Sequence, residues 1–184
     1  WGSRWSGAMG DGVDTPNQLT PFEIDMMTPL GITNSFVEMS NTFGGACGIH
    51  TNGKTYCWGY ANAYGAPLTG DNSQLPIEIN MRNNAEENTF AKLGDMGRQS
   101  SYWNTCAIHT NNKAFCWGGS WSPAFGDGLG NSSSHPTPFE VQLGKAGLSN
   151  NILEIATGEK NTCLIHNGGA GSQKILCAGE AWDI

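Results

Sequence analysis

The stretch that decides the fold is "CGIHTNGKTYCWG", residues 47–59, which recurs as "CAIHTNNKAFCWG" at residues 106–118. Each copy has the pattern of two short strands joined by a three-residue loop, whose last residue adopts the left-handed conformation. Gly53 adopts it without steric cost, and Asn112 tolerates it. With this loop the two cysteines of each copy lie opposite one another in a non-hydrogen-bonded pair, where antiparallel strands are closest. We therefore predict two β-hairpins, each with a disulfide between its strands.

The cysteines fall into three local pairs. The third stretch, "CLIHNGGAGSQKILC", begins at residue 163, and its four extra residues lie in a glycine-rich tip, which leaves the pairing of its cysteines unchanged. An even number of cysteines at repeated spacing indicates a disulfide framework and an oxidising compartment. Structural zinc sites place cysteines two to four residues apart, whereas nine residues separate those of the first two pairs. The predicted disulfides are Cys47–Cys57, Cys106–Cys116 and Cys163–Cys177.

The sequence around the hairpins is repeated as well. A Trp-Gly pair occurs at residues 1, 58 and 117, at intervals of 57 and 59 residues, and leads each time into a glycine-rich loop. A strand that begins with proline follows the loop, and another short strand precedes each hairpin, so a unit holds about four strands. Periods of this length with Gly and Trp markers are typical of propeller blades. The proline-led strands are expected at 21–24, 76–79 and 138–141, and the preceding strands at residues 36, 90 and 152.

The whole pattern, "CxIHTxxxxxCWG…GDG…TPFE", resembles the repeat of the regulator of chromosome condensation family, and its cysteines resemble the secreted bacterial branch of that family. The resemblance implies an all-β fold of β-propeller blades, with three repeat equivalents of about 58 residues. It identifies Gly2, Gly53, Gly59 and Gly118 as turn and repeat glycines, and Trp1, Trp58 and Trp117 as residues that pack between blades. It is not specific for function, because the family includes nucleotide exchange factors, a β-lactamase inhibitor, ubiquitin-ligase domains and a photoreceptor.

The two ends of the sequence each hold part of a unit. We expect a second half-blade at 1–35, blades at 36–89 and 90–151, and a first half-blade at 152–184. Near the C-terminus Ala178-Gly179 stands where Trp-Gly is expected, and Trp182 aligns with Trp5. Closed propellers typically have four to eight blades, so three completions stay open: a fragment of a roughly seven-bladed propeller, a two-chain ring, or an open filament.

Composition narrows the class of protein. The chain has 26 glycines among 184 residues, only 9 Lys and Arg, and a net charge of −7. Many turn formers indicate short strands with tight turns, and the scarcity of basic residues argues against nucleic-acid binding. No apolar run approaches the ~18 residues of a membrane span. Because the sequence begins at Trp1 without an initiator Met or signal peptide, we expect a processed or excised extracellular product.

No residue pattern indicates catalysis, a metal or a cofactor. His50, His109 and His166 recur at one place in every hairpin, but equivalent residues of neighbouring blades lie too far apart to share an ion, so we interpret them as strand residues. Asp11, Asp71 and Asp127 lie beside glycines and lack the remaining ligands of a calcium loop. Hydrolase, zinc-protease and phosphate-loop motifs do not occur in the sequence. We therefore expect that the protein is not an enzyme.

Aromatic residues that do not follow the repeat are candidates for binding a partner. Tryptophan and tyrosine in loops stack on sugars or anchor protein partners, although they also cover small loop cores. Asn131 begins the one standard glycosylation sequon. The candidate ligand or interface aromatics are Trp5, Tyr60, Tyr64, Trp103, Trp121 and Trp182.

Two functions compete at this stage. The first is a non-catalytic extracellular structural module that forms a homo-oligomer or polymer, because open half-blades at the ends of the chain invite pairing with a second chain. The second is part of a larger secreted propeller that binds a protein or glycan ligand through its loops. Loss of assembly after removal of residues 175–184 would favour the first, and loss of ligand binding after Trp121→Ala would favour the second.

Overall fold

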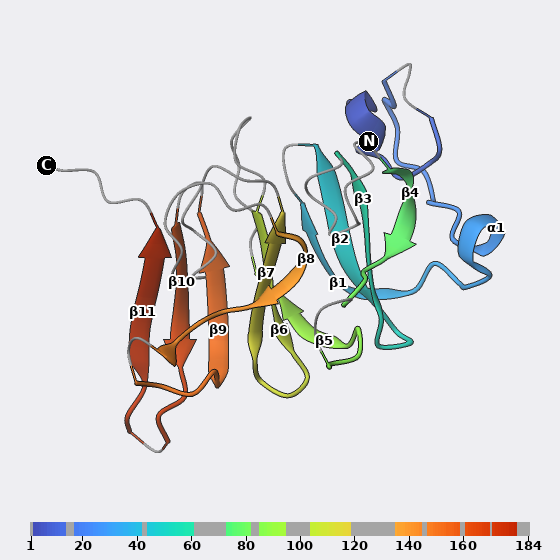
Figure 1. Ribbon diagram of the computed structural model, residues 1–184. Helices are drawn as coiled ribbons and strands as arrows, with labels where there is room; N and C mark the ends of the chain where they lie inside the picture. The colour runs from blue at the N-terminus through green and yellow to red at the C-terminus, as the bar shows by residue number, and fades with distance from the viewer. Residues whose placement is uncertain are drawn as a thin grey trace, which may run out of the picture.

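The computed structural model describes residues 2–13, 17–41, 44–60, 73–81, 85–94, 104–118, 135–144, 147–158, 161–169 and 171–179. These residues form three antiparallel sheets that stand side by side (Figure 1). The N-terminal residues lie at one end of the row, and the C-terminal strand lies at the other. The predicted all-β architecture of propeller blades is therefore confirmed.

The first two sheets have four strands each in chain order, and the third has three. The first contains β1 (Phe36–Asn41), β2 (Gly45–His50), β3 (Thr55–Gly59) and β4 (Ser73–Glu78). The second contains β5 (Phe90–Leu93), β6 (Asn104–His109), β7 (Ala114–Gly118) and β8 (His135–Glu140). The third contains β9 (Ile152–Thr157), β10 (Asn161–His166) and β11 (Lys174–Gly179) in the order β11-β10-β9. Two helical turns, η1 (Trp5–Gly7) and α1 (Met27–Leu30), precede the first sheet.

The hairpins have the predicted register. Cys47 pairs with Cys57 and Cys106 with Cys116, and the Cα atoms of each pair are 4.0 and 4.1 Å apart, as in a non-hydrogen-bonded pair. The third pair, Cys163 and Cys177, is bonded with the same Cα separation of 4.1 Å despite its longer tip. Gly53 and Asn112 have φ angles of 83° and 67°, so both loops use the expected left-handed residue. Turn chemistry and cysteine spacing thus determine each hairpin locally.

Neighbouring sheets pack through apolar faces. The disulfides of the first two sheets each lie on the face that packs against the next sheet. The cluster between the first and second sheets includes Cys47, Ile49, Cys57, Phe90, Leu93, Phe115 and Trp117. The cluster between the second and third includes Cys106, Ile108, Cys116, Val141, Ile152, Ile155 and Leu164. The blades are therefore joined by one repeated kind of contact.

One predicted strand is wrong. Residues 21–24, which correspond to the second half of β4 and β8, are not a strand in the structure. A strand needs a hydrogen-bonded neighbour. The neighbour of β4 is β3. At the N-terminal segment the corresponding pairing is reduced to a single bridge between Gly2 and Gln18. This bridge corresponds to the pairs Gly59–Ser73 and Gly118–His135 of the complete blades. Among the described residues, the N-terminal segment is thus a blade edge without its partner strand.

Candidate functional site

The recurring histidines fasten each hairpin to the segment that enters its blade. Nε2 of His50, His109 and His166 lies 2.9 Å from the carbonyl oxygens of Thr33, Glu87 and Ser149, respectively. All three side chains are buried, and Nδ1 of His50 and of His109 accepts a backbone N–H from the hairpin loop. For His50 and His109, an Nδ1 that accepts a hydrogen bond leaves Nε2 as the donor to the carbonyl oxygen. These histidines are structural, as the sequence interpretation proposed.

Replacing His109 with alanine is expected to lower the free energy of unfolding by about 2 kcal/mol, because two buried hydrogen bonds and ring packing are lost. The imidazole lies 5.7 Å from the ring of Phe90 and 5.8 Å from that of Phe115, both edge-on. Denaturant unfolding of the non-reduced protein measures the change. His109→Phe keeps the aromatic ring, so it separates hydrogen bonding from packing. A loss below about 0.5 kcal/mol for His109→Ala would contradict this role.

The described residues offer no metal site. No group of three or more histidine, cysteine, aspartate or glutamate side chains converges in the described part of the chain. Asp11 forms an ion pair with Arg4 at 2.7 Å and accepts the N–H of Val13, as a turn aspartate does. Asp71 and Asp127 lie outside the described residues. Within the ranges that the structure describes, no helix has the length and apolar character needed to cross a membrane.

The outward surface of the first sheet, which we term the N-terminal face, consists of Phe36, Met39, Gly48, Tyr56 and Trp58. It repeats the surface of the second sheet, where Phe90 lies edge-on to Phe115 and His109, as Phe36 does to Tyr56 and His50. On the second sheet this cluster is covered by the first sheet, and Phe90 and Leu93 are buried. On the N-terminal face Phe36 is only half-buried and Met39 is 46% exposed.

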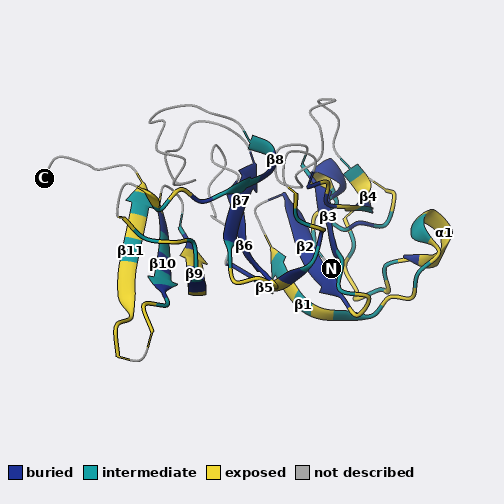
Figure 2. Ribbon diagram, turned by 60° about the horizontal axis from the view of Figure 1, so that its bottom comes forward, coloured by how far each residue is buried: buried dark blue, intermediate teal, exposed yellow. Residues whose placement is uncertain are grey.

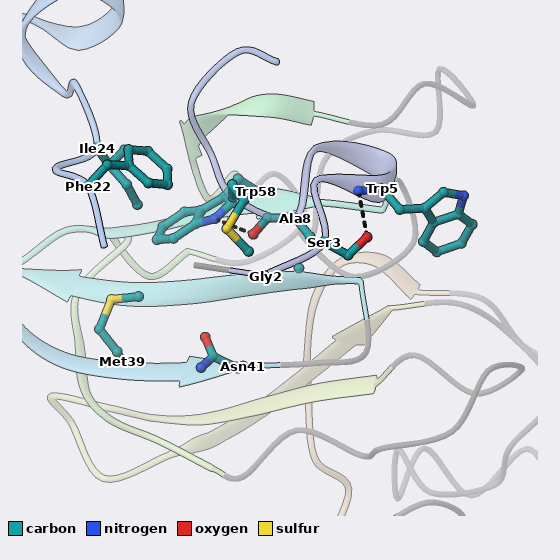
Figure 3. A pocket seen from close by; sticks show the side chains of 11 residues that line it. Gly2, Ser3, Trp5, Ala8, Phe22, Ile24, Met39, Asn41 and Trp58 are labelled. Carbon is teal, nitrogen blue, oxygen red and sulfur yellow. Dashed lines mark hydrogen bonds between the residues drawn. The ribbon is translucent and has the colours of Figure 1, made fainter. Parts of the chain in front are cut away.

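A cavity of about 670 Å³ opens over this face. In Figure 3 Phe22 and Ile24 of the N-terminal segment lie on one side of it and Met39 on the other, with Trp58 between them. Trp58 donates its indole N–H to the carbonyl oxygen of Ala8 at 3.2 Å, which holds the segment against the blade. The N-terminal segment therefore covers part of the face and leaves an apolar opening beside it.

At the opposite end of the row lies the C-terminal face, formed by Cys163, Ile165, Ile175 and Cys177. Its counterparts on the first two sheets are buried between blades, for example Thr55 and Ala114, which are both 0% exposed. Ile175 occupies the same place and is 75% exposed. Figure 2 shows that β11 is mainly exposed, whereas β2, β3, β6 and β7 are buried. The C-terminal face is thus the disulfide-bearing half of a blade contact, and no described residue supplies the other half.

The outer edge of β11 is also open. Among the described strands, β10 is the only neighbour of β11, whereas β3 and β7 each have a second neighbour. Because Ile165 and Ile175 stand two residues from the closely spaced cysteine pair, the N–H and C=O of Ile175 point away from β10. In the complete blades the corresponding carbonyl oxygens, of Thr55 and Ala114, accept the N–H of Ile79 and Val141. The edge is therefore a template for another strand.

The structure places only some of the predicted aromatic residues. Trp58 and Trp117 are buried at the two corresponding blade surfaces. Trp5, 51% exposed, stacks on Tyr60 with ring centroids 5.7 Å apart, and in Figure 3 its side chain points away from Trp58. The remaining predicted positions, Trp1, Tyr64, Trp103, Trp121, Trp182 and the sequon residue Asn131, lie outside the described residues.

Two further residue types of the blade junctions were not identified from the sequence. Asn88 donates its amide to the carbonyl oxygen of Thr55 at 3.1 Å and thereby ties the segment that enters the second blade to the edge of the first. Asn150 does the same to Ala114, whose carbonyl oxygen and N–H it contacts at 3.1 and 3.0 Å. A lysine at the start of the last hairpin strand pairs with a glutamate of the fourth strand: Lys54 with Glu78 and Lys113 with Glu140. Alignment of the repeats on their strands would have revealed both types.

Comparisons with known proteins identify the fold. No protein-family model matches the sequence, and no curated protein has a similar sequence. Prp20p from Saccharomyces cerevisiae matches with a TM-score of 0.64 and 16% identity over 98% of this chain and 40% of that chain. Human WBSCR16 matches with a TM-score of 0.54 and 13% identity over 76% of this chain and 33% of that chain. Yeast RCC1 (Prp20) bound to Kap60 gives a TM-score of 0.52 and 10% identity over 73% and 30% of the two chains.

These similarities define a class of fold. The chain has an RCC1-like β-propeller fold, and it spans 30 to 40% of the length of these three structures. At sequence identities of 10 to 16%, these matches indicate a shared fold and say nothing about binding partners. Within the described residues, the two faces at the ends of the row and the outer edge of β11 are the surfaces left available to a partner.

Proposed function

We propose that this protein is a non-catalytic, secreted structural module that associates with itself head to tail, the C-terminal face of one copy against the N-terminal face of the next. The observation that carries the proposal is the contrast between Ile175, 75% exposed, and its two buried counterparts. The three disulfides support an extracellular location, since such bonds persist in oxidising compartments.

The second copy is the partner that fits both faces. The contact of the first sheet with the second, and of the second with the third, joins a disulfide-bearing face to a face with Phe or Ile at the start of its first strand. At the two ends of the row, the C-terminal face is of the disulfide-bearing kind, and the N-terminal face is of the kind that begins with Phe. A second copy placed at either end would add one more contact of this kind to the row. Head-to-tail contacts of this kind form a ring if the rotation closes and a filament if it does not.

The sheet edges are complementary as well. Residues 21–24 have the sequence of the fourth strand of a blade but no described strand beside them, and β11 is a third strand with no fourth among the described strands. Pairing them between copies would complete one blade from two chains. Added-strand pairing of this kind supplies backbone hydrogen bonds, while the apolar faces supply buried area.

Sedimentation velocity over a range of concentrations, together with electron microscopy of the non-reduced protein, tests the proposal. We expect the average mass to rise well above the 19.6 kDa of one chain, with rings or filaments in the images. Ile175→Pro removes the outward N–H of β11, the counterpart of the Ala114 N–H that Asn150 accepts, and is expected to weaken assembly at least about fivefold without breaking the inner pairs. Ile175→Ser keeps the N–H and should still assemble.

A monomer at every accessible concentration would overturn self-association. In that case the alternative gains support, in which the open faces are covered by further blades and the protein binds a protein or glycan ligand through its loops. Equal assembly of Ile175→Pro and the unchanged protein would show that the outward N–H of Ile175 takes no part in the contact. We further propose that the module has no enzymatic activity, consistent with its blade-repeated polar residues.

A further inference from the structure

We infer that the junction between two copies is held by a specific polar lock, in which Lys174 of one copy pairs with Glu23 of the next, and Asn34 of that next copy binds the backbone of Ile175. This inference rests on the proposed self-association and names the residues that determine which surface is recognised. The ligand of this site is a second copy of the chain.

The ion pair follows from the two junctions inside the chain. His50 and His109 each donate their backbone N–H to the carbonyl oxygen of the lysine that follows the hairpin loop, Lys54 or Lys113, at 2.8 Å. In the third hairpin His166 lies opposite Lys174, so Lys174 is the third member of the series. Lys54 and Lys113 reach the glutamates of the adjacent fourth strands at 3.6 and 3.1 Å. Lys174 has no fourth strand beside it in the described chain.

The missing carboxylate is present at the other end. Glu78 stands in "PIEI" and Glu140 in "PFEV", and Glu23 stands in the matching "PFEI". Tyr56 lies opposite Glu78, and Phe115 lies opposite Glu140. Leu176 is the corresponding residue of β11. In a ladder between two copies it would therefore lie opposite Glu23. Glu23 and Lys174 are both exposed, and neither forms an ion pair with another described residue. Opposite charges are therefore left free at the two ends, at positions that pair within each complete blade.

Asn34 supplies the second half of the lock. Asn88 and Asn150 precede their blades by two residues and bind the edge of the preceding blade, at Thr55 and Ala114. Asn34 precedes β1 by two residues, yet it is exposed and its side chain makes no hydrogen bond with a described residue. The counterpart of Thr55 and Ala114 is Ile175, whose backbone groups are free at the edge of β11. In the assembled pair Asn34 reaches Ile175 of the preceding copy.

The position of Gly2 limits how far this ladder extends. In the complete blades Gly59 and Gly118 pair with the first residue of the fourth strand, and Gly2 already occupies that place opposite Gln18. Gly179 is the counterpart of Gly2, and both have positive φ angles, of 156° and 132°. The intermolecular ladder therefore ends at Cys177 opposite Phe22, and Gly2 of the receiving copy completes the shared strand.

Charge reversal tests the lock by sedimentation velocity. Glu23→Lys places two lysines at the junction, and Lys174→Glu places two glutamates there, so each variant alone is expected to associate at least about tenfold more weakly than the unchanged protein. An equimolar mixture of the two variants restores one opposite-charge pair at every junction. We expect the mixture, and the double variant Glu23→Lys/Lys174→Glu, to assemble within about threefold of the unchanged protein.

A matched pair of asparagine variants tests the second contact. Asn34→Ala is expected to weaken association about fivefold and to leave the unfolding of the dilute monomer unchanged, because its amide is free until a second copy binds. Asn88→Ala removes the same contact inside the chain and is expected to lower the unfolding midpoint instead. Circular dichroism confirms that every variant is folded.

The outcomes separate the two proposals. If the unchanged protein assembles but the charge variants assemble equally well, or if their mixture is not restored, the lock is wrong and self-association stands. If the unchanged protein remains a monomer, the proposed function and the lock fail together. Weak association of both single variants with recovery in the mixture supports the lock, since no intramolecular effect of either substitution is repaired by mixing.

Discussion

Replacing Trp117 with alanine is expected to lower the free energy of unfolding by about 4 kcal/mol, the largest loss for a single side chain of this protein. The indole is 0% exposed and lies in the cluster between the first and second sheets. It packs beside Phe90, with ring centroids 5.6 Å apart, opposite the Cys47–Cys57 disulfide. Its removal leaves a cavity at the surface by which two blades are joined, and denaturant unfolding without reductant measures the cost.

Two variants show whether the effect is one of packing. Trp117→Phe retains an aromatic ring and removes an indole N–H that has no hydrogen-bond partner among the described residues, so its cost is expected to be about 1.5 kcal/mol. Trp5→Ala truncates a half-exposed indole and is expected to cost below about 1 kcal/mol. A cost for Trp117→Ala as small as that of Trp5→Ala would mean that the blades are not held together through this surface.

The hairpins could be predicted from sequence because the forces that form them are local. The loop residues at 51–53 and 110–112 select one turn, and the cysteine spacing then allows one register. The strand expected at 21–24 failed for the opposite reason. Its residues have the right pattern, but a strand is defined by its neighbour, and no described strand lies beside it.

The candidate site was only partly predictable for the same reason. The repeats in the sequence predicted the blades themselves, whereas the contacts that join blades connect residues far apart in the sequence. Asn88 and Thr55 are 33 residues apart, and Trp5 meets Tyr60 across 55. Asparagine two residues before a strand is an unremarkable signal by itself. It gains meaning once the structure shows the same contact at two junctions and the same residue, unpaired, at the free end.

Replacing Gly59 with alanine is expected to destabilise the protein by about 3 kcal/mol, because two separate costs coincide at this position. Gly59 has a φ of 106°, which residues with a Cβ rarely adopt. A Cβ here would also overlap the carbonyl oxygen of Gly44 and the Cα of Gly45, the residue of β2 with which Gly59 pairs. The glycine of the repeated Trp-Gly pair is thus required by backbone proximity as well as by conformation.

Gly53 separates these two costs, because it has a φ of 83° but no atom within 4 Å of the position a Cβ would take. Gly53→Ala is therefore expected to cost about 1 kcal/mol, the conformational part alone. Gly53→Asn should be nearly neutral, since Asn112 adopts a φ of 67° at the same place in the second hairpin. Thermal unfolding of the three variants ranks them. Equal losses for Gly59→Ala and Gly53→Ala would show that strand proximity at the Trp-Gly pair adds nothing, and that glycine recurs there for its φ angle only.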